Sequence, residues 1–95
     1  MDPLTYIFGP SARIDVICCF LENPDQHMNL ADLAKRIQKT PGGIYHVLPN
    51  LVENELIKEV PVSKHRKVYK LNKENQVIVK LLKFYQDTKK QINGL

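Results

Sequence analysis

Apolar residues recur every three or four positions in four stretches of the chain, which is the spacing of one face of an α-helix. These stretches predict helices over residues 11–22, 30–38, 41–54 and 73–92. Each begins at or just after a residue whose side chain suits the N-cap position: Ser11, Asn29, Thr40 and Asn72.

Pro49 falls inside the third predicted helix. A proline in a helix interior removes one backbone donor and can kink the axis, but the apolar stripe continues on both sides of it. We therefore predict a helix that bends or loses one hydrogen bond near Pro49. The face opposite the apolar stripe is formed by Gly42, Tyr45, His46, Pro49, Asn50 and Glu53.

Two short stretches after the third predicted helix have the composition of β-strands. Residues 57–62 and 67–71 hold β-branched and aromatic side chains among charged ones, with a polar turn over residues 63–66. Pro61 marks the first stretch as an edge strand or a strand end. Together they predict a β-hairpin.

Two further segments lie outside these elements. Tyr6, Ile7 and Phe8 are apolar neighbours near the N-terminus, and we expect them to pack against the core. His27 and Met28 lie between the first and second predicted helices, and we expect an extended link there.

The order of these elements is helix, helix, tight turn, helix, strand, basic turn, strand and helix. It predicts a winged helix-turn-helix of the α+β, mostly α class. We expect a single domain over residues 1–95, with a three-helix core and a β-hairpin wing over residues 11–71 and a C-terminal dimerisation helix over residues 73–92. A chain of this length buries only about two-thirds of its unfolded surface, so a shared apolar face would add stability.

Charge is distributed unevenly along the chain. The net charge is +4, yet residues 1–34 hold one basic and five acidic side chains, whereas residues 35–95 hold thirteen basic and five acidic ones. A basic C-terminal two-thirds indicates a polyanionic partner. A solvated, lysine-rich surface is the alternative.

The longest fully apolar run covers only residues 16–21, far short of the roughly 20 residues of a transmembrane helix. The N-terminus also lacks the pattern of a signal peptide, so we expect a cytoplasmic protein. Cys18 and Cys19 are adjacent, and neighbouring cysteines on one helix rarely bridge each other. We expect small core residues in a reducing compartment. The alternative, a metal or redox sensor, lacks the usual cysteine spacings.

A helix that reads DNA needs one face anchored in a core and one face free for base edges in the major groove, and the third predicted helix is divided in this way. His46 and Asn50 on its free face suit base edges, and Asn suits adenine. Tyr45 suits a phosphate or a sugar, or else packs against the strands. Gly42 and Gly43 let the backbone approach a phosphate, or else form a loose turn. Because this face has no Arg or Lys, only moderate base discrimination is expected.

The turn of the hairpin supplies the charge that the third helix lacks. A hairpin with a basic tip can lie along the DNA backbone or enter the adjacent minor groove, and a solvated hairpin is the alternative. Cations on the second predicted helix and its turn add phosphate contacts. The predicted DNA-binding residues are Lys35, Arg36, Lys39, Thr40, Gly42, Gly43, Tyr45, His46, Asn50, Lys64, His65, Arg66 and Lys67.

The last predicted helix has two apolar stripes, so it must bury more than one side. We expect one stripe to cover its own domain and the other to pair with a second copy of the chain. The predicted dimerisation residues are Val77, Ile78, Leu81, Leu82, Phe84 and Tyr85.

Segments over nearly the whole chain match one known pattern. They are Asp2-Pro3-Leu4, Phe8-Gly9, Arg13, residues 21–24, residues 29–34, residues 44–51, residues 56–59 and residues 69–75. With them the chain resembles the archaeal winged helix-turn-helix regulators, broadly the ArsR-like and MarR-like group. Similar proteins carry a Leu-Pro-x-Leu step in the reading helix. The resemblance implies a cytoplasmic homodimer on a roughly palindromic DNA site, with dimer contacts made by the terminal helices.

The chain departs from that pattern in two places. The family often has Gly where Glu55 stands, so Glu55 either accepts a strained left-handed backbone or ends the helix differently. ArsR-like metal sensors carry a Cys-x-Cys on the reading unit, and this chain lacks it. Neither a metal nor another cofactor is expected.

Two classes of function fit these observations. The leading hypothesis is a dimeric transcription regulator that binds double-stranded DNA. The alternative is a winged-helix protein-interaction adaptor, or an architectural DNA-binding protein without strong sequence specificity. An enzyme is not expected, because His27, His46 and His65 lie on separate elements and none has a metal-ligand spacing.

Overall fold

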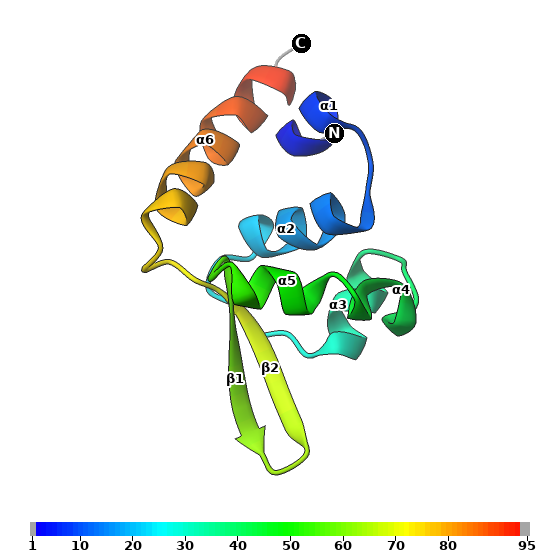
Figure 1. Cartoon of the computed structure of the whole chain (residues 1–95). Helices are drawn as coiled ribbons and strands as arrows, with labels where there is room; N and C mark the ends of the chain where they lie inside the picture. Colours follow the sequence, from blue (N-terminus) through cyan, green and yellow to red (C-terminus); the bar gives the residue numbers. More distant parts are fainter. Residues whose placement is uncertain (1, 94–95) are drawn as a thin grey trace.

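Figure 1 shows the computed structural model, which describes residues 2–93. Within them lie helices α1 (Pro3–Phe8), α2 (Ala12–Glu22), α3 (Leu30–Arg36), α4 (Pro41–Tyr45), α5 (Leu48–Glu53) and α6 (Gln76–Asn93), and strands β1 (Ile57–Ser63) and β2 (Arg66–Leu71). The strands form an antiparallel hairpin. The predicted winged helix-turn-helix fold is confirmed.

The hydrophobic core lies where α2, α3 and the α4–α5 unit meet. Phe20, Leu33, Ile44 and Leu51 come from these helices and are fully buried. In Figure 1 the hairpin projects away from the three-helix core on one side, whereas α1 and α6 lie next to each other on the opposite side. One core therefore anchors both the hairpin and the α4–α5 unit, which corresponds to the third predicted helix and is called the reading unit below.

The predicted third helix is divided into two short helices. α4 ends before His46, and α5 begins after Val47. The amide of Val47 donates to the carbonyl of Ile44 (3.0 Å) across the break. The break places Pro49 in the first turn of α5, where a missing backbone donor costs no intrahelical bond. The predicted local break is confirmed, although it separates the helix into two.

The hairpin is longer than predicted at its tip. Its register leaves only Lys64 and His65 in the turn, and β1 continues past Pro61 to Ser63. The register is irregular between Pro61 and Ser63. Each strand of a two-stranded sheet is an edge strand, so the missing donor of a proline is tolerated there.

The base of the hairpin is tied to the helices on both sides. The backbone of Met28 exchanges two hydrogen bonds with that of Tyr69 (2.9 and 2.8 Å), which confirms the extended link. Asn72 is buried, and its amide donates to the carbonyl of Glu55 (2.8 Å). This contact explains why Asn72 does not cap α6 as predicted. Asn75 takes that position, so α6 begins three residues later.

Two residues after the last helical residue of α3 and of α5, the chain adopts a left-handed backbone. The φ angle is 57° at Gln38 and 60° at Glu55. The amide of Leu56 donates to the carbonyl of Leu51 (3.0 Å), which is the hydrogen bond of a Schellman C-cap. Glu55 therefore adopts the strained conformation that glycine would take without cost. Helix α3 ends at Arg36, two residues earlier than predicted.

Glu55→Gly is expected to raise the free energy of unfolding by about 0.5–1 kcal/mol. The left-handed conformation costs a non-glycine residue roughly 1–2 kcal/mol, and the greater freedom of glycine in the unfolded chain offsets part of that gain. Urea unfolding at one protein concentration measures the difference. Glu53→Gly is the matched control, and we expect it to lose about 1 kcal/mol within the helix. A destabilised Glu55→Gly variant would contradict the assigned strain.

Helix α1 was not predicted from the apolar pattern. Asp2 accepts a hydrogen bond from the amide of Thr5 (2.8 Å) and Pro3 occupies the first turn, so the Asp-Pro pair was the signal for this helix. The expectation that the next apolar residues pack against the core is wrong for Tyr6, Ile7 and Phe8. They are exposed because Pro3 and Leu4 occupy the buried face of this short helix.

No helix within residues 2–93 is long and apolar enough to cross a membrane.

Candidate nucleic-acid interface

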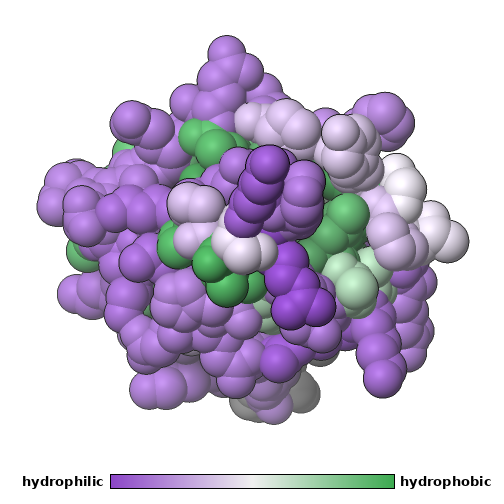
Figure 2. Space-filling view, turned by 90° about the horizontal axis from the view of Figure 1, so that it is seen from below, coloured by the Kyte–Doolittle hydropathy of each residue, from purple (hydrophilic) through white to green (hydrophobic). Residues whose placement is uncertain are grey.

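A hollow of about 440 Å³ lies between the hairpin and the start of α3. Its lining mixes apolar side chains with the basic residues of the hairpin. The main contributors are Leu30, Ala31, Tyr45, Val62, His65, Arg66 and Lys67. Figure 2 views the molecule from the side of the hairpin tip and shows apolar surface among the hydrophilic side chains there. Four predicted DNA-binding residues, one from α4 and three from the hairpin, are thus brought together.

Tyr45 stands between α4 and the hairpin. Its side chain is 60% exposed, and it lines both the hollow beside α3 and a second one that Pro49 and Lys67 also line. The rings of Tyr45 and His46 meet edge to face, with centroids 5.7 Å apart. Tyr45 is therefore beside the strands but accessible to a ligand, and its ring orients the neighbouring exposed His46.

The charges of the hairpin tip differ in their partners. Within residues 2–93, no carboxylate lies within ion-pairing distance of Lys64 or Arg66. Lys67 is 3.4 Å from the carboxylate of Glu59 on the facing strand. The phenol of Tyr69 and this carboxylate raise the pKa of Lys67. Lys64 and Arg66 thus offer uncompensated charge, whereas Lys67 shares its charge with Glu59.

The predicted cations of the second helix do not all share this face. Lys35 lies one helical turn after Ala31, which lines the hairpin hollow, but Lys35 does not itself line it. Arg36 lines a separate hollow between α2 and α6. Lys39 is 3.7 Å from Asp15 on α2. The structure therefore separates Arg36 from the basic hairpin, and it partly neutralises Lys39.

The two glycines of α4 are helical and do not form a loose turn. Thr40 caps the helix by accepting a hydrogen bond from the amide of Gly43 (3.1 Å). A Cβ added to Gly42 would meet no atom within 4 Å. Because packing does not require glycine at this position, the open backbone of Gly42 remains free for close approach by a ligand.

Asn50, a predicted base reader, is exposed but is hydrogen-bonded to other side chains of its own chain. Its side-chain oxygen accepts hydrogen bonds from the guanidinium of Arg13 on α2 and from the amide of Asn54 (3.3 Å). Arg13 was not among the predicted DNA-binding residues. The sequence signal was weak, because Arg13 is an isolated cation in the acidic first third of the chain.

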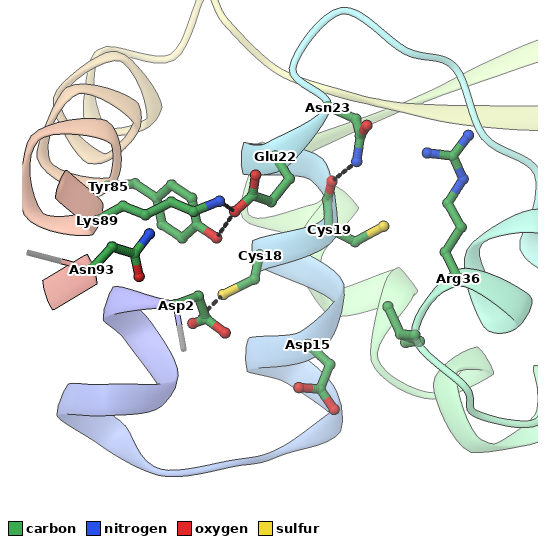
Figure 3. Close-up of a pocket in the computed structure, with 11 residues that line it drawn as sticks. Asp2, Asp15, Cys18, Cys19, Glu22, Asn23, Arg36, Tyr85, Lys89 and Asn93 are labelled. Atoms are coloured by element: carbon green, nitrogen blue, oxygen red, sulfur yellow. Dashed lines mark hydrogen bonds and ion pairs between the residues drawn. The ribbon is translucent and has the colours of Figure 1, made fainter.

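A different hollow of about 630 Å³ lies between α2 and α6, and Figure 3 shows its side chains. The phenol of Tyr85 donates to Glu22 (2.6 Å), and Lys89 also pairs with Glu22. Lys89 and Tyr85 lower the pKa of Glu22, while burial and the hydrogen bond to Glu22 raise the pKa of Tyr85. This cluster connects α6 to α2, a helix of the three-helix core.

The adjacent cysteines occupy the same region, as predicted for core residues. Cys18 is buried and Cys19 is half-buried. The thiol of Cys18 donates to Asp2 (3.0 Å), and burial raises its pKa. A protonated thiol is a poor nucleophile and metal ligand. Within residues 2–93 no group of three or more His, Cys, Asp or Glu side chains is placed to hold a metal ion.

The two apolar stripes of α6 have different surroundings. Ile78 and Tyr85 are buried in the core of their own chain, and Leu81 and Leu82 are half-buried against it. Two predicted dimerisation residues remain on the surface: Val77 and Phe84, which are 64% and 42% exposed. One stripe therefore packs against its own domain, and the other is exposed at Val77 and Phe84 but half-buried at Leu81.

Comparisons with known proteins identify the fold. No protein-family model matches this chain, and no curated protein matches it. Among solved structures, it resembles MepR, a transcription regulator of the Staphylococcus aureus multidrug efflux pump MepA, in its DNA-binding conformation. The TM-score is 0.66 at 17% identity, covering 96% of this chain and 66% of MepR.

Two further structures extend this comparison. A MepR point mutant bound to an oligodeoxyribonucleotide gives a TM-score of 0.65 at 20% identity, covering 94% of this chain and 66% of the mutant. The ferric uptake regulator from Francisella tularensis, solved with iron, gives a TM-score of 0.64 at 20% identity, covering 72% of this chain and 58% of that protein. This chain spans 58% to 68% of the length of these proteins, and it shares with them the winged-helix regulator fold.

Proposed function

We propose that this chain is a DNA-binding transcription regulator. The observation that carries the proposal is the combination of a helical unit without Lys or Arg, α4–α5, with the basic wing beside it, whose Lys64 and Arg66 have no carboxylate partner within residues 2–93. The similarity to a MepR structure bound to an oligodeoxyribonucleotide supports DNA as the ligand.

The α4–α5 unit enters the major groove, which is about 12 Å wide and admits one helix. The wing lies along the adjacent backbone or in the minor groove beside it. His46 is exposed and meets base edges, while Tyr45 and the open backbone of Gly42 contact sugar and phosphate. Because the cations lie on the wing and not on the reading unit, binding is firm and sensitive to salt, with moderate base discrimination.

The functional unit in this proposal is a homodimer. Val77 and Phe84 on α6, with the exposed apolar residues of α1, form the surface that a second copy covers. α1 and α6 pack against each other on the side of the three-helix core opposite the hairpin tip. Two reading units would then enter successive major grooves about 34 Å apart.

Selection of genomic fragments tests this function. We expect the protein to retain, at about 0.05 M salt, fragments that share a roughly palindromic sequence, with affinity falling linearly on a logarithmic salt scale. Sedimentation with a short duplex of that sequence should give two chains per duplex.

Other outcomes of this experiment favour other functions. No DNA binding at low salt would reject the proposal and favour the protein-interaction adaptor. Binding without any shared sequence would indicate an architectural DNA-binding protein. One chain per duplex would reject the homodimer.

A further inference from the structure

Arg13 brings a positive charge to a reading unit that has none of its own. Residues 40–56 include no Lys or Arg. Arg13 lies in the first turn of α2, and its Nη1 donates to the side-chain oxygen of Asn50 on α5. This contact joins residues 37 positions apart in the sequence, so it depends on the packing of α2 against the reading unit.

The charge of Arg13 is uncompensated within the described part of the chain. No carboxylate of residues 2–93 forms an ion pair with it, and its partner is the neutral amide of Asn50. A guanidinium has five N–H donors in a fixed plane. Asn50 receives one of them, which holds the guanidinium beside α5 and leaves its other donors for an anion.

The same contact changes the chemistry available to Asn50. Arginine has no acceptor, so the amide atom that faces it must be the oxygen. This oxygen also accepts from Asn54 (3.3 Å), and an amide oxygen has two lone pairs. Pairing with adenine requires the oxygen to accept from the base while the nitrogen donates to it. Asn50 cannot do so while it holds Arg13.

The position of α2 indicates which part of DNA Arg13 meets. In Figure 1, α2 runs along one side of α5 and the hairpin extends from the other side. A helix with its side chains is about 10–12 Å wide and fills a major groove of about 12 Å. A cation beside such a helix therefore meets the phosphates at the groove edge and not the bases at its floor.

We propose that Arg13 binds a DNA phosphate on the edge of the major groove opposite the wing, and that Asn50 is the positioning residue that holds its guanidinium. This inference rests on the proposed DNA-binding function. It implies that the reading unit is clamped from both sides, by Arg13 on one phosphate strand and by Lys64 and Arg66 on the other.

Binding of the selected duplex over a series of salt concentrations tests the role of Arg13. For each bound chain, Arg13→Gln is expected to weaken binding about eightfold at 0.1 M salt, equally for the selected and an unrelated duplex, and to reduce the logarithmic salt slope by about 0.9. Arg13→Lys keeps the charge and should retain most of the slope. Lys83→Gln on α6 makes the same charge change on an exposed residue far in sequence from the reading unit, and should leave binding unchanged.

Asn50→Ala tests the positioning role. It should also weaken binding and reduce the salt slope, with no change in the preferred sequence. Combined with Arg13→Gln, it should add little, because both changes remove one contact. Urea unfolding identifies any variant that loses its fold. If Arg13→Gln does not fold, the DNA affinity of Arg13→Lys is compared with that of the unsubstituted protein instead.

Two results would overturn the inference. One is a salt slope unchanged by Arg13→Gln in a protein that binds DNA. The other is a changed base preference in Asn50→Ala. Failure of the unsubstituted protein to bind DNA would instead reject the proposed function, so the two failures are distinguishable.

Discussion

Replacement of Lys64, Arg66 and Lys67 by glutamine is expected to lower affinity for duplex DNA by about 60-fold to 500-fold for each bound chain at 0.1 M salt. Each phosphate contact releases counterions and contributes about 0.9 to the logarithmic salt slope, or roughly eightfold in affinity at this salt concentration. Lys64 and Arg66 have no carboxylate partner within residues 2–93, whereas Lys67 pairs with Glu59. The effect should therefore be closer to that of two contacts than of three.

The loss should be the same for every DNA sequence, because phosphates carry no sequence information. Fluorescence anisotropy with labelled duplexes from 0.05 to about 0.3 M salt measures both affinity and slope. The matched control replaces three exposed lysines of α6 with glutamine, which removes the same charge far from the wing: Lys80, Lys83 and Lys90.

An equal loss in the control would show that only net charge matters. An unchanged affinity in the wing variant would reject the wing as a DNA contact. A loss confined to one sequence would mean that the wing reads bases instead of the backbone.

Tyr85→Phe is expected to lower the free energy of unfolding by about 1.5 kcal/mol at neutral pH. The change removes a hydroxyl that donates to the carboxylate of Glu22 (2.6 Å) and keeps the buried ring. Hydrogen bonds to charged groups contribute about 1.5–3 kcal/mol. The lower end applies here, because the side chain of Glu22 is 41% exposed.

The difference between Tyr85→Phe and the unsubstituted protein should depend on pH. Lys89 and Tyr85 lower the pKa of Glu22 in the folded chain. A carboxyl group with a lowered folded pKa stabilises above its unfolded pKa, near 4.3, and loses this contribution as pH falls through the folded pKa. The two proteins should therefore converge in stability below about pH 4.

Urea unfolding between about pH 3 and pH 7 measures this dependence. Tyr6→Phe is the matched control, because Tyr6 is exposed; we expect it to change stability by less than about 0.5 kcal/mol at every pH. A difference for Tyr85→Phe that stays constant down to pH 3 would show that the hydroxyl contributes independently of the charge on Glu22.

The order of the elements was predictable because each depends on short-range chemistry. Helical spacing of apolar residues and N-caps such as Ser11 located α2, α3 and the reading unit. Pro49 marked the break between α4 and α5 through its missing donor. Glu55 stood out against the family pattern, and the structure gives it the left-handed backbone that the pattern implies.

The candidate site was only partly predictable, because several of its features depend on contacts between distant residues. Arg36 and Lys35 are sequence neighbours on one helix, yet only Arg36 lines the hollow between α2 and α6. Asn72 looked like a helix cap, but its side chain is drawn to the carbonyl of Glu55. Periodicity shows that a residue is on a free face, without showing which neighbour that face meets.

The sequence by itself thus determined the order of the elements from α2 to α6, the hairpin, and the concentration of cations on the wing and not on the reading unit, since these follow from residue spacing and composition. Only the tertiary structure decided which charges are available. It pairs Lys39 with Asp15 and Lys67 with Glu59, and it brings Arg13 to Asn50. Packing sets these distances between side chains far apart in sequence, and electrostatic interactions depend on distance in space.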